Sequence, residues 1–261
     1  MRRVQNTGIV LGCGILTISD FTYDSYHNLL GIIYDNRYIF ANYHNNADIK
    51  RPCIIRHDID LDVGAALRFA KLENSFSSEL KSTYFVLLSS DFYNIFSKGT
   101  LVKLDAIITI GHELGFHFDE TKYNGNTLES LSEAVQEEAF ILGRALGIGI
   151  KAVSMHRPSK RILDANISFP GLENSYSWRF INDFKYLSDS RMRWRENAEE
   201  IIASQEYESL HILTHAFWYS DKKETTREKL TRFITDSKKK QYDNLSDNFI
   251  NLEEFILREE I

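Results

Sequence analysis

The chain has 261 residues, which is enough for one substantial core, and barrel-like α/β domains often reach this length undivided. It carries 31 Lys and Arg residues against 37 Asp and Glu, and its basic residues form no dense block, which argues against nucleic-acid binding. Cys13 and Cys53 are too few for a disulfide framework and too far apart for a CxxC site, so a reducing, cytoplasmic setting is expected.

The first apolar run, Gly8–Ile18, follows two arginines and resembles the core of a signal peptide. It contains three glycines, and no small-residue cleavage pattern follows it before Asp20. It is also far shorter than the roughly 20 apolar residues that span a bilayer. A buried strand or a loosely packed start is the favoured interpretation. No integral membrane segment is expected elsewhere.

Short apolar runs rich in β-branched and aromatic residues then alternate with longer helical patterns. This alternation favours a mostly parallel sheet, either open or closed as a barrel. The predicted strands are Cys53–Arg56, Ser82–Leu88, Gly115–Phe118, Lys151–Met155, Phe184–Leu187 and Leu210–Thr214. The predicted helices are Val63–Leu72, Leu101–Ile110, Thr127–Leu146 and Glu196–Ala203.

The helix predicted over Thr127–Leu146 has the clearest end signals. Asn126 and Glu129 form a start that resembles a capping box, and Gly147 is a plausible C-cap. The stretch Lys160–Asn182 breaks the rhythm and predicts a long loop with a short helix at most. In the charged tail from residue 221, apolar spacing predicts an outer amphipathic helix and a further helix over Phe249–Ile256.

Residues that bind metals or transfer protons fall at the ends of the predicted strands. In parallel α/β folds these carboxyl ends meet at one edge, where ligands bind. Asp58 and Asp60 follow the first strand with period-2 spacing, so they point to the same side and repel unless a cation or proton lies between them. The alternative is a helix cap, for which Asp62 is the better candidate.

Histidines end three of the other predicted strands. His117 is followed by Asp119 on the same strand face, and an imidazole with a carboxylate suits Zn²⁺ or a similar divalent ion. His156 and Arg157 end the next strand, where an arginine can orient a carboxylate. His215 ends the last strand and could donate a proton to a leaving group. Each is unremarkable singly, and their shared position favours one common site.

Six segments resemble, in order, the motifs of polysaccharide deacetylases, the NodB-homology group. They are Arg56–Asp60, Ser82–Val86, Gly111–Asp119, His156–Pro158, Ser188–Trp194 and Leu213–Trp218. These motifs span residues 52–219, and the chain looks closest to divergent members found in surface-polysaccharide and lipopolysaccharide biosynthesis. The resemblance implies an α/β fold, a distorted (β/α) barrel of about seven strands. It implies a single catalytic domain over residues 1–261, with residues 220–261 as a C-terminal helical extension.

The resemblance also implies roles for individual side chains. The implied catalytic residues are Asp58 as general base, Arg157 as the residue that orients the base, Asp189 as the acidic residue of the fourth motif, and His215 as general acid. The implied metal ligands are Asp60 and His117. Thr121 stands where the family usually has a second histidine ligand. Asp119 is the favoured replacement, and His57, Glu113 and His156 are the alternatives.

Together these assignments predict a metal-dependent hydrolase that removes an acetyl group from an N-acetylated sugar or sugar precursor in surface polysaccharide biosynthesis. A carbohydrate is the expected substrate, and Zn²⁺ is the expected ion, with Mn, Co or Ni as alternatives. One rival is an amidohydrolase acting on a cyclic amide. The other is a silent carbohydrate-binding or scaffold relative that lost a ligand at Thr121. The sequence does not indicate an oligomeric state.

Overall fold

The computed structural model describes residues 17–123 and 127–261, which form two compact units divided between Asp221 and Lys222. Most of the run Gly8–Ile18 therefore lies outside the described residues. In the C-terminal unit, the predicted amphipathic helix is α7 (Thr226–Ser246). The second predicted helix of the tail is only a 3-10 turn, Leu252–Glu254. No helix in the described parts of the chain is both long and apolar enough to cross a membrane.

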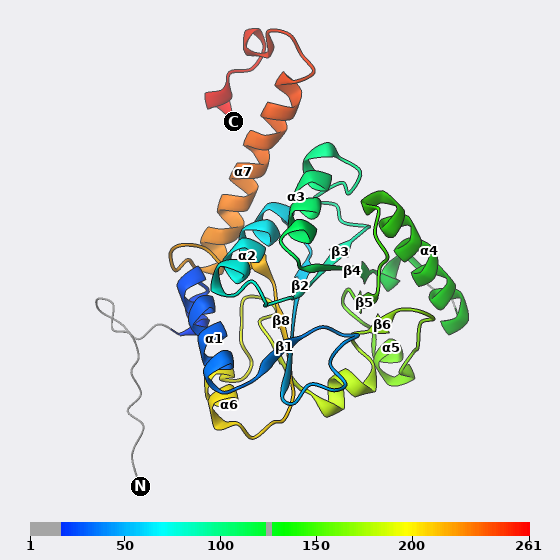
Figure 1. Ribbon diagram of the computed structural model, residues 1–261. Coiled ribbons are helices and arrows are strands. Elements are labelled where there is room, and N and C mark those ends of the chain that lie inside the picture. The colour runs from blue at the N-terminus through cyan, green and yellow to red at the C-terminus, as the bar shows by residue number, and fades with distance from the viewer. Residues whose placement is uncertain (1–16, 124–126) are drawn as a thin grey trace. The chain divides into compact units, whose positions relative to one another are not determined.

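Every strand pairing in the larger unit is parallel, as expected for strands separated by helical crossovers. The sheet order is β6-β5-β4-β3-β2-β8-β7, and β1 pairs with the start of β2 (Figure 1). The strands are β1 (Ile39–Ala41), β2 (Pro52–Ile59), β3 (Thr83–Leu87), β4 (Glu113–Phe118), β5 (Ala152–Met155), β6 (Glu173–Asn174), β7 (Lys185–Ser188) and β8 (Leu210–Thr214).

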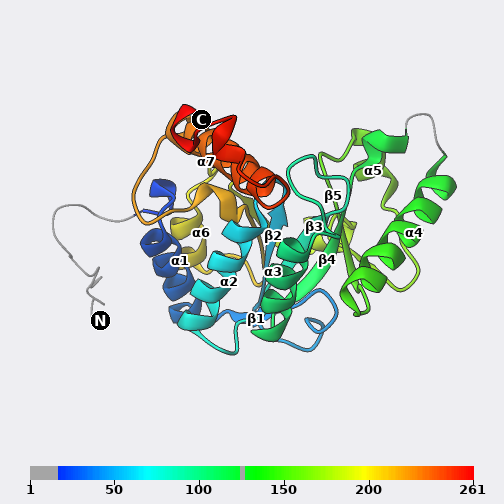
Figure 2. The same cartoon turned by 90° about the horizontal axis from the view of Figure 1, so that it is seen from above.

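The sheet curls into a half-barrel with its helices on the outside (Figure 2), which confirms the predicted distorted (β/α) barrel of about seven strands. No pairing among the described residues joins β6 to β7, so the barrel is open on that side. The helices of this unit are α1 (Tyr23–Asp35), α2 (Val63–Phe76), α3 (Lys98–Thr109), α4 (Leu128–Leu146), α5 (Lys160–Ala165) and α6 (Ala198–Ser204).

Polar caps fix the starts of the outer helices. Asp62 caps α2 by accepting a hydrogen bond from the Gly64 N–H at 2.7 Å, as the sequence suggested, which leaves the two preceding aspartates available for the site. Thr127 caps α4, and the predicted cap, Asn126, lies outside the described residues. Gly147 ends α4 in the left-handed region with φ 68°, which confirms the predicted C-cap.

Strand β2 lies inside the sheet between β3 and β8, and all eight of its residues are buried. Its two faces pack differently because successive side chains alternate. Ile54, Arg56 and Asp58 share the face that belongs to the barrel interior, where Ile54 packs in an aromatic cluster with Tyr43 and Phe85. The opposite face packs against the outer helices.

Gly115 in β4 is required by the packing of this interior. A Cβ atom at this position would lie 2.4 Å from the Phe85 ring and 3.2 Å from the Ala152 carbonyl oxygen. Since atoms do not approach this closely, any side chain at Gly115 would displace Phe85. The missing side chain is therefore what allows Phe85 to fill the centre of the half-barrel.

On the outer face of β2, one buried carboxylate receives four hydrogen bonds. The oxygens of Glu73 on α2 accept from Tyr26 at 2.6 Å, His57 at 3.0 Å, Ser82 at 2.5 Å and Tyr84 at 2.8 Å. All five side chains are completely buried. Burial raises the pKa of Glu73, but the charge of His57 and its hydrogen bond, together with His112 and Ser82, lower this pKa to about 2. Glu73 thus joins α1, α2, β2 and β3 as an ionised group.

We expect Glu73→Gln to lower the free energy of unfolding at neutral pH by about 3 kcal/mol. The change removes the buried negative charge, and the glutamine NH₂ group would face side chains that themselves donate hydrogen bonds. A carboxyl whose pKa is depressed in the folded state stabilises it above its unfolded pKa of 4.5, and this contribution is lost as the pH falls toward 2. Urea unfolding at neutral pH and near pH 3 should therefore show a smaller difference between wild type and variant in acid.

Glu79→Gln is the matched control, because Glu79 is exposed just beyond the end of α2. It should leave the unfolding free energy close to that of the wild type at both pH values. An equal loss in the two variants, or a Glu73→Gln difference that does not shrink in acid, would contradict the assigned role.

Candidate active site

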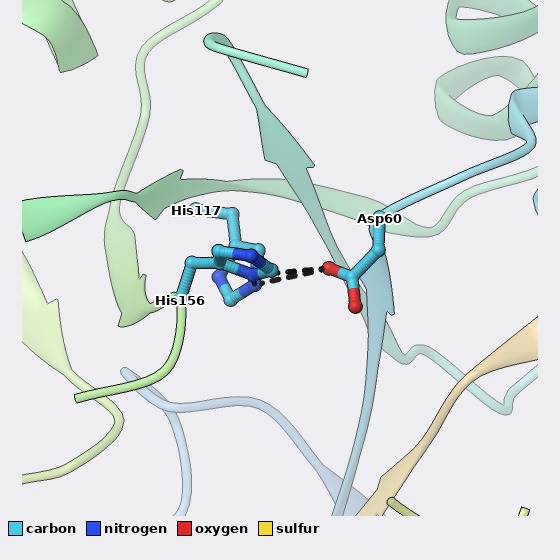
Figure 3. Close-up of side chains that lie close together, drawn as sticks. All are labelled: Asp60, His117 and His156. Atoms are coloured by element: carbon cyan, nitrogen blue, oxygen red, sulfur yellow. Dashed lines mark hydrogen bonds and ion pairs between the residues drawn. The ribbon is translucent and has the colours of Figure 1, made fainter. Parts of the chain in front are cut away.

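Three possible metal ligands meet at the carboxyl edge of the sheet. Asp60 follows β2, His117 lies near the end of β4, and His156 follows β5. The Asp60 Oδ1 atom lies 3.3 Å from His117 Nε2 and 3.4 Å from His156 Nδ1, and the two nitrogens are 3.2 Å apart. Figure 3 shows the three side chains facing one another.

These distances fit one small divalent ion. For bonds of ~2.0–2.1 Å in a tetrahedron, neighbouring ligand atoms lie ~3.4 Å apart, which matches the three spacings. His117 Nδ1 is 3.3 Å from the Ser154 carbonyl oxygen, which can only accept. That contact places the His117 proton on Nδ1 and leaves Nε2 free to bind a metal. Two imidazoles and one carboxylate are a donor set suited to Zn²⁺.

Asp60 is held as a carboxylate. Burial raises its pKa, but hydrogen bonds from His117 and His156, together with the charges of His117 and His215, bring the pKa well below its usual range. This lowering belongs to the state in which the histidines carry protons toward Asp60; a bound cation would replace them in stabilising the carboxylate.

Asp58 lies beside this group and is held by a buried arginine. Arg56 donates from Nη2 to Asp58 Oδ2 at 2.8 Å, and its guanidinium also donates to Ser175 and Tyr176. The same Asp58 oxygen is 3.7 Å from His117 Nε2. The other oxygen, Oδ1, is buried and accepts no hydrogen bond from the described residues. Asp58 thus presents one unused lone-pair site next to the candidate metal centre.

His215 and Asp189 form a second pair at the same edge. Asp189 is fully buried after β7, and its Oδ1 lies 2.6 Å from His215 Nδ1. Both Asp189 oxygens also accept from the His215 backbone N–H, at 3.1 and 3.0 Å. Burial lowers the pKa of His215, but the charge and hydrogen bond of Asp189 raise it to about 9. The other nitrogen, Nε2, lies 3.8 Å from Asp60 Oδ2 and so faces the site.

The structure brings together five of the seven residues proposed from the sequence: Asp58, Asp60, His117, Asp189 and His215. It does not bring Asp119 to the candidate metal centre. The Asp119 Oδ1 atom instead accepts from the backbone N–H and hydroxyl of Thr121, at 3.0 and 2.7 Å. Strand β4 ends at Phe118, so the alternation that would place Asp119 beside His117 stops one residue too early.

Arg157 also differs from its expected place. Across the described residues, no hydrogen bond or ion pair joins Arg157 to Asp58, and Arg56 occupies that position instead. The sequence contains a signal for this arrangement. Arg56 precedes Asp58 by two residues in an apolar strand, so the two side chains share a face, and a buried arginine needs an anionic partner.

The remaining alternatives for the metal site separate clearly. His156, which the sequence offered only as an alternative ligand, is in the three-residue group. His57 lies on the outer face of β2 with Glu73, on the side away from Asp58. Glu113, at the start of β4, lies 3.2 Å from His44. A candidate can reach the metal site only if it lies at the carboxyl end of its strand and on the inner face. Short sequence motifs do not specify either property.

No family model and no curated protein matches the sequence. Several solved structures are similar at low identity. The deacetylase PplD of Streptococcus pyogenes, in complex with acetate, is 12% identical with a TM-score of 0.41, over 81% of this chain and 86% of that one. A family 4 acetyl xylan esterase from Clostridium thermocellum, in complex with cobalt, is 12% identical with a TM-score of 0.37, over 72% and 84%.

A CE4-family pseudoenzyme from Bacillus anthracis is also similar, at 12% identity with a TM-score of 0.40, over 78% of this chain and 65% of that one. Active and inactive proteins thus stand among the similar structures. Because each TM-score is below 0.5, these likenesses do not transfer residue roles to this chain. The chemistry of the site has to be argued from its own geometry.

We expect His156→Ala to weaken Zn²⁺ binding by more than about 100-fold, since it removes one of three converging ligand atoms. Asp119→Ala should bind Zn²⁺ like the wild type, because Asp119 is bonded to its own loop. Competition with a chromophoric chelator measures both affinities. A large loss in Asp119→Ala, with His156→Ala unaffected, would reverse the assignment.

Proposed function

We propose that the protein is a metal-dependent hydrolase that removes an acetyl group from an N-acetylated sugar. The observation that carries this proposal is the convergence of three metal-binding atoms with a held carboxylate and a cationic histidine. A silent relative would have no need for both a base and an acid beside the same ligand group. Asp58 and His215 are each held in place by a buried partner of opposite charge, and a general base or acid has to be positioned in this way to act.

Asp60, His117 and His156 would hold the divalent ion, with Zn²⁺ the first expectation and Mn, Co or Ni the alternatives. When bound, such an ion supplies a Lewis acid that polarises the acetyl carbonyl and lowers the pKa of water. The protein contributes the ionised state of Asp60 and the proton position on His117, which together leave the donor atoms ready to bind.

Asp58 would act as the general base through its Oδ1 atom, which has no partner among the described residues. Arg56 fixes the carboxylate by donating a hydrogen bond to its other oxygen. A base placed in this way contributes roughly 10²–10⁴-fold to the rate. Arg56 is therefore our candidate for the orienting role that the resemblance implied for Arg157.

His215 would act as the general acid. Asp189 holds Nδ1 and the cationic form, so the proton on Nε2 faces the site. An amine leaving an acetamide must be protonated as the C–N bond breaks, whereas the alcohol of an ester leaves more readily as an anion. A histidine kept cationic at neutral pH therefore supports an amide as the substrate.

The proposal extends to the cellular setting. We propose a precursor of a surface polysaccharide as the substrate and the cytoplasm as the compartment. The first is supported by the ordered motifs over residues 52–219, and the second by Cys53, which is a buried free thiol.

We expect Asp58→Asn to lower kcat for an N-acetylated sugar by at least ~10²-fold, because the amide cannot accept the proton. Metal content should stay close to that of the wild type, since Asp58 is not one of the three ligands. The thermal midpoint should fall, because the buried Arg56 keeps an oxygen acceptor but loses its counter-charge, so kcat is compared well below that midpoint. Asp119→Asn is the matched control, with kcat expected near that of the wild type. Acetate release by the zinc-loaded proteins measures both, and a wild-type rate in Asp58→Asn would refute the assignment of the base.

Asp189→Asn should separate acid catalysis from the rest of the reaction. The change removes the charge that keeps His215 cationic, so we expect kcat to fall by about 10²-fold on an N-acetylated sugar. On an activated aryl acetate, whose leaving group departs as an anion, the loss should be much smaller. Equal losses on the two substrates would indicate a structural role for Asp189.

A further inference from the structure

A cavity of about 370 Å³ is lined by residues that follow β4 and β5 in the chain. Its walls come from the segment after β4 and the segment after β5, the two strands whose ends supply His117 and His156. Its lining residues are Glu120, Thr121, Tyr123, Leu131, Arg157, Ser159 and Arg161. Arg157 directly follows His156 in the chain, so the cavity and the metal centre share this turn.

The two walls are tied together by one acidic residue. The Glu120 carboxylate accepts hydrogen bonds from both the backbone N–H and the hydroxyl of Ser159, the latter at 2.9 Å. Thr121 is likewise turned toward Asp119, by two hydrogen bonds. The acidic and hydroxyl groups of the cavity are thus already engaged in building it.

The positive charges at this cavity come from two arginines. Arg157 is exposed and makes no hydrogen bond or ion pair with any other residue that the structure describes. Arg161 lines the same cavity four residues later. A guanidinium presents a planar fork of donors that matches the oxygens of a phosphoryl group, often in a bidentate way.

The backbone at Arg157 is also unusual. Its φ angle is +52°, in the left-handed region that residues with a side chain rarely adopt, and Pro158 follows it. Such conformations persist where the surrounding structure enforces them, and they cluster at ligand-binding sites. Here the strained residue lines the cavity, while Arg56 serves Asp58.

We propose that this cavity binds a phosphoryl group of the substrate through Arg157 and Arg161. The inference rests on the proposed deacetylase function and deepens it: the substrate is a phosphorylated N-acetylated sugar, and not a neutral polymer. Binding the phosphoryl group here would place the sugar next to the metal centre on the side of β4 and β5.

The test is binding of pyrophosphate to the full chain, measured by calorimetry with zinc bound and again with a chelator present. We expect Arg157→Ala and Arg161→Ala each to weaken the affinity by at least about fivefold, with Arg157→Lys in between because it keeps the charge but loses the fork. Arg37→Ala is the matched control and should bind like the wild type. Arg37 is also exposed, with φ +61°, but it precedes β1 at the opposite end of the sheet.

Pyrophosphate binding that persists with the chelator and depends on both arginines supports the proposal. Equal affinities in all variants, or binding that disappears on chelation, overturn it, because the anion would then sit elsewhere or on the metal. This readout needs no turnover. If the protein binds pyrophosphate in this way but releases no acetate, the phosphoryl subsite stands and the hydrolase assignment fails. If it releases acetate but its pyrophosphate affinity does not depend on the arginines, the hydrolase assignment stands and the subsite fails.

Discussion

The ion pair between Arg56 and Asp58 is the interaction on which the interior of the half-barrel depends. A guanidinium with 0% exposure is strongly unfavourable unless its donors and charge are satisfied. Asp58, Ser175 and Tyr176 accept its hydrogen bonds, and the rings of Phe85 and Tyr176 lie 5.4 and 4.8 Å from its central carbon. The contacts that satisfy Arg56 in the core also hold its guanidinium in place, and the guanidinium in turn fixes the position of the candidate base, Asp58.

Strand β2 carries polar residues on both of its faces, and each face belongs to a different hydrogen-bond network. Asp58 faces inward, and the neighbouring His57 faces outward to Glu73. His57 Nδ1 also lies 2.6 Å from the hydroxyl of Thr214, the residue before His215. The outer network therefore ties together the two strands that present the candidate base and acid. The hydrogen bonds of this outer network thus also fix the relative positions of the strands that carry the candidate base and acid.

The sequence predicts the long strands and most of the outer helices, because periodicity and caps are local signals. It misses β1 and β6, which are short and are defined by pairing with distant strands. It also places Asp119 and Arg157 in the site by extrapolating strand alternation and family order past the ends of β4 and β5. Where a strand stops is set by tertiary packing. The role of Arg56 does have a local signal, its two-residue spacing from Asp58 in an apolar strand, but the family order pointed to Arg157 instead.

The close packing at Gly115 constrains which substitutions the interior can accept during evolution. A methyl group there would press on Phe85, whose ring lies against Arg56, and the disturbance would reach Asp58 within two contacts. Among descendants of this protein, a side chain at Gly115 is therefore expected only together with a smaller residue in place of Phe85. Paired substitution at these two positions would show that the packing of this core is constrained by the position of the candidate base.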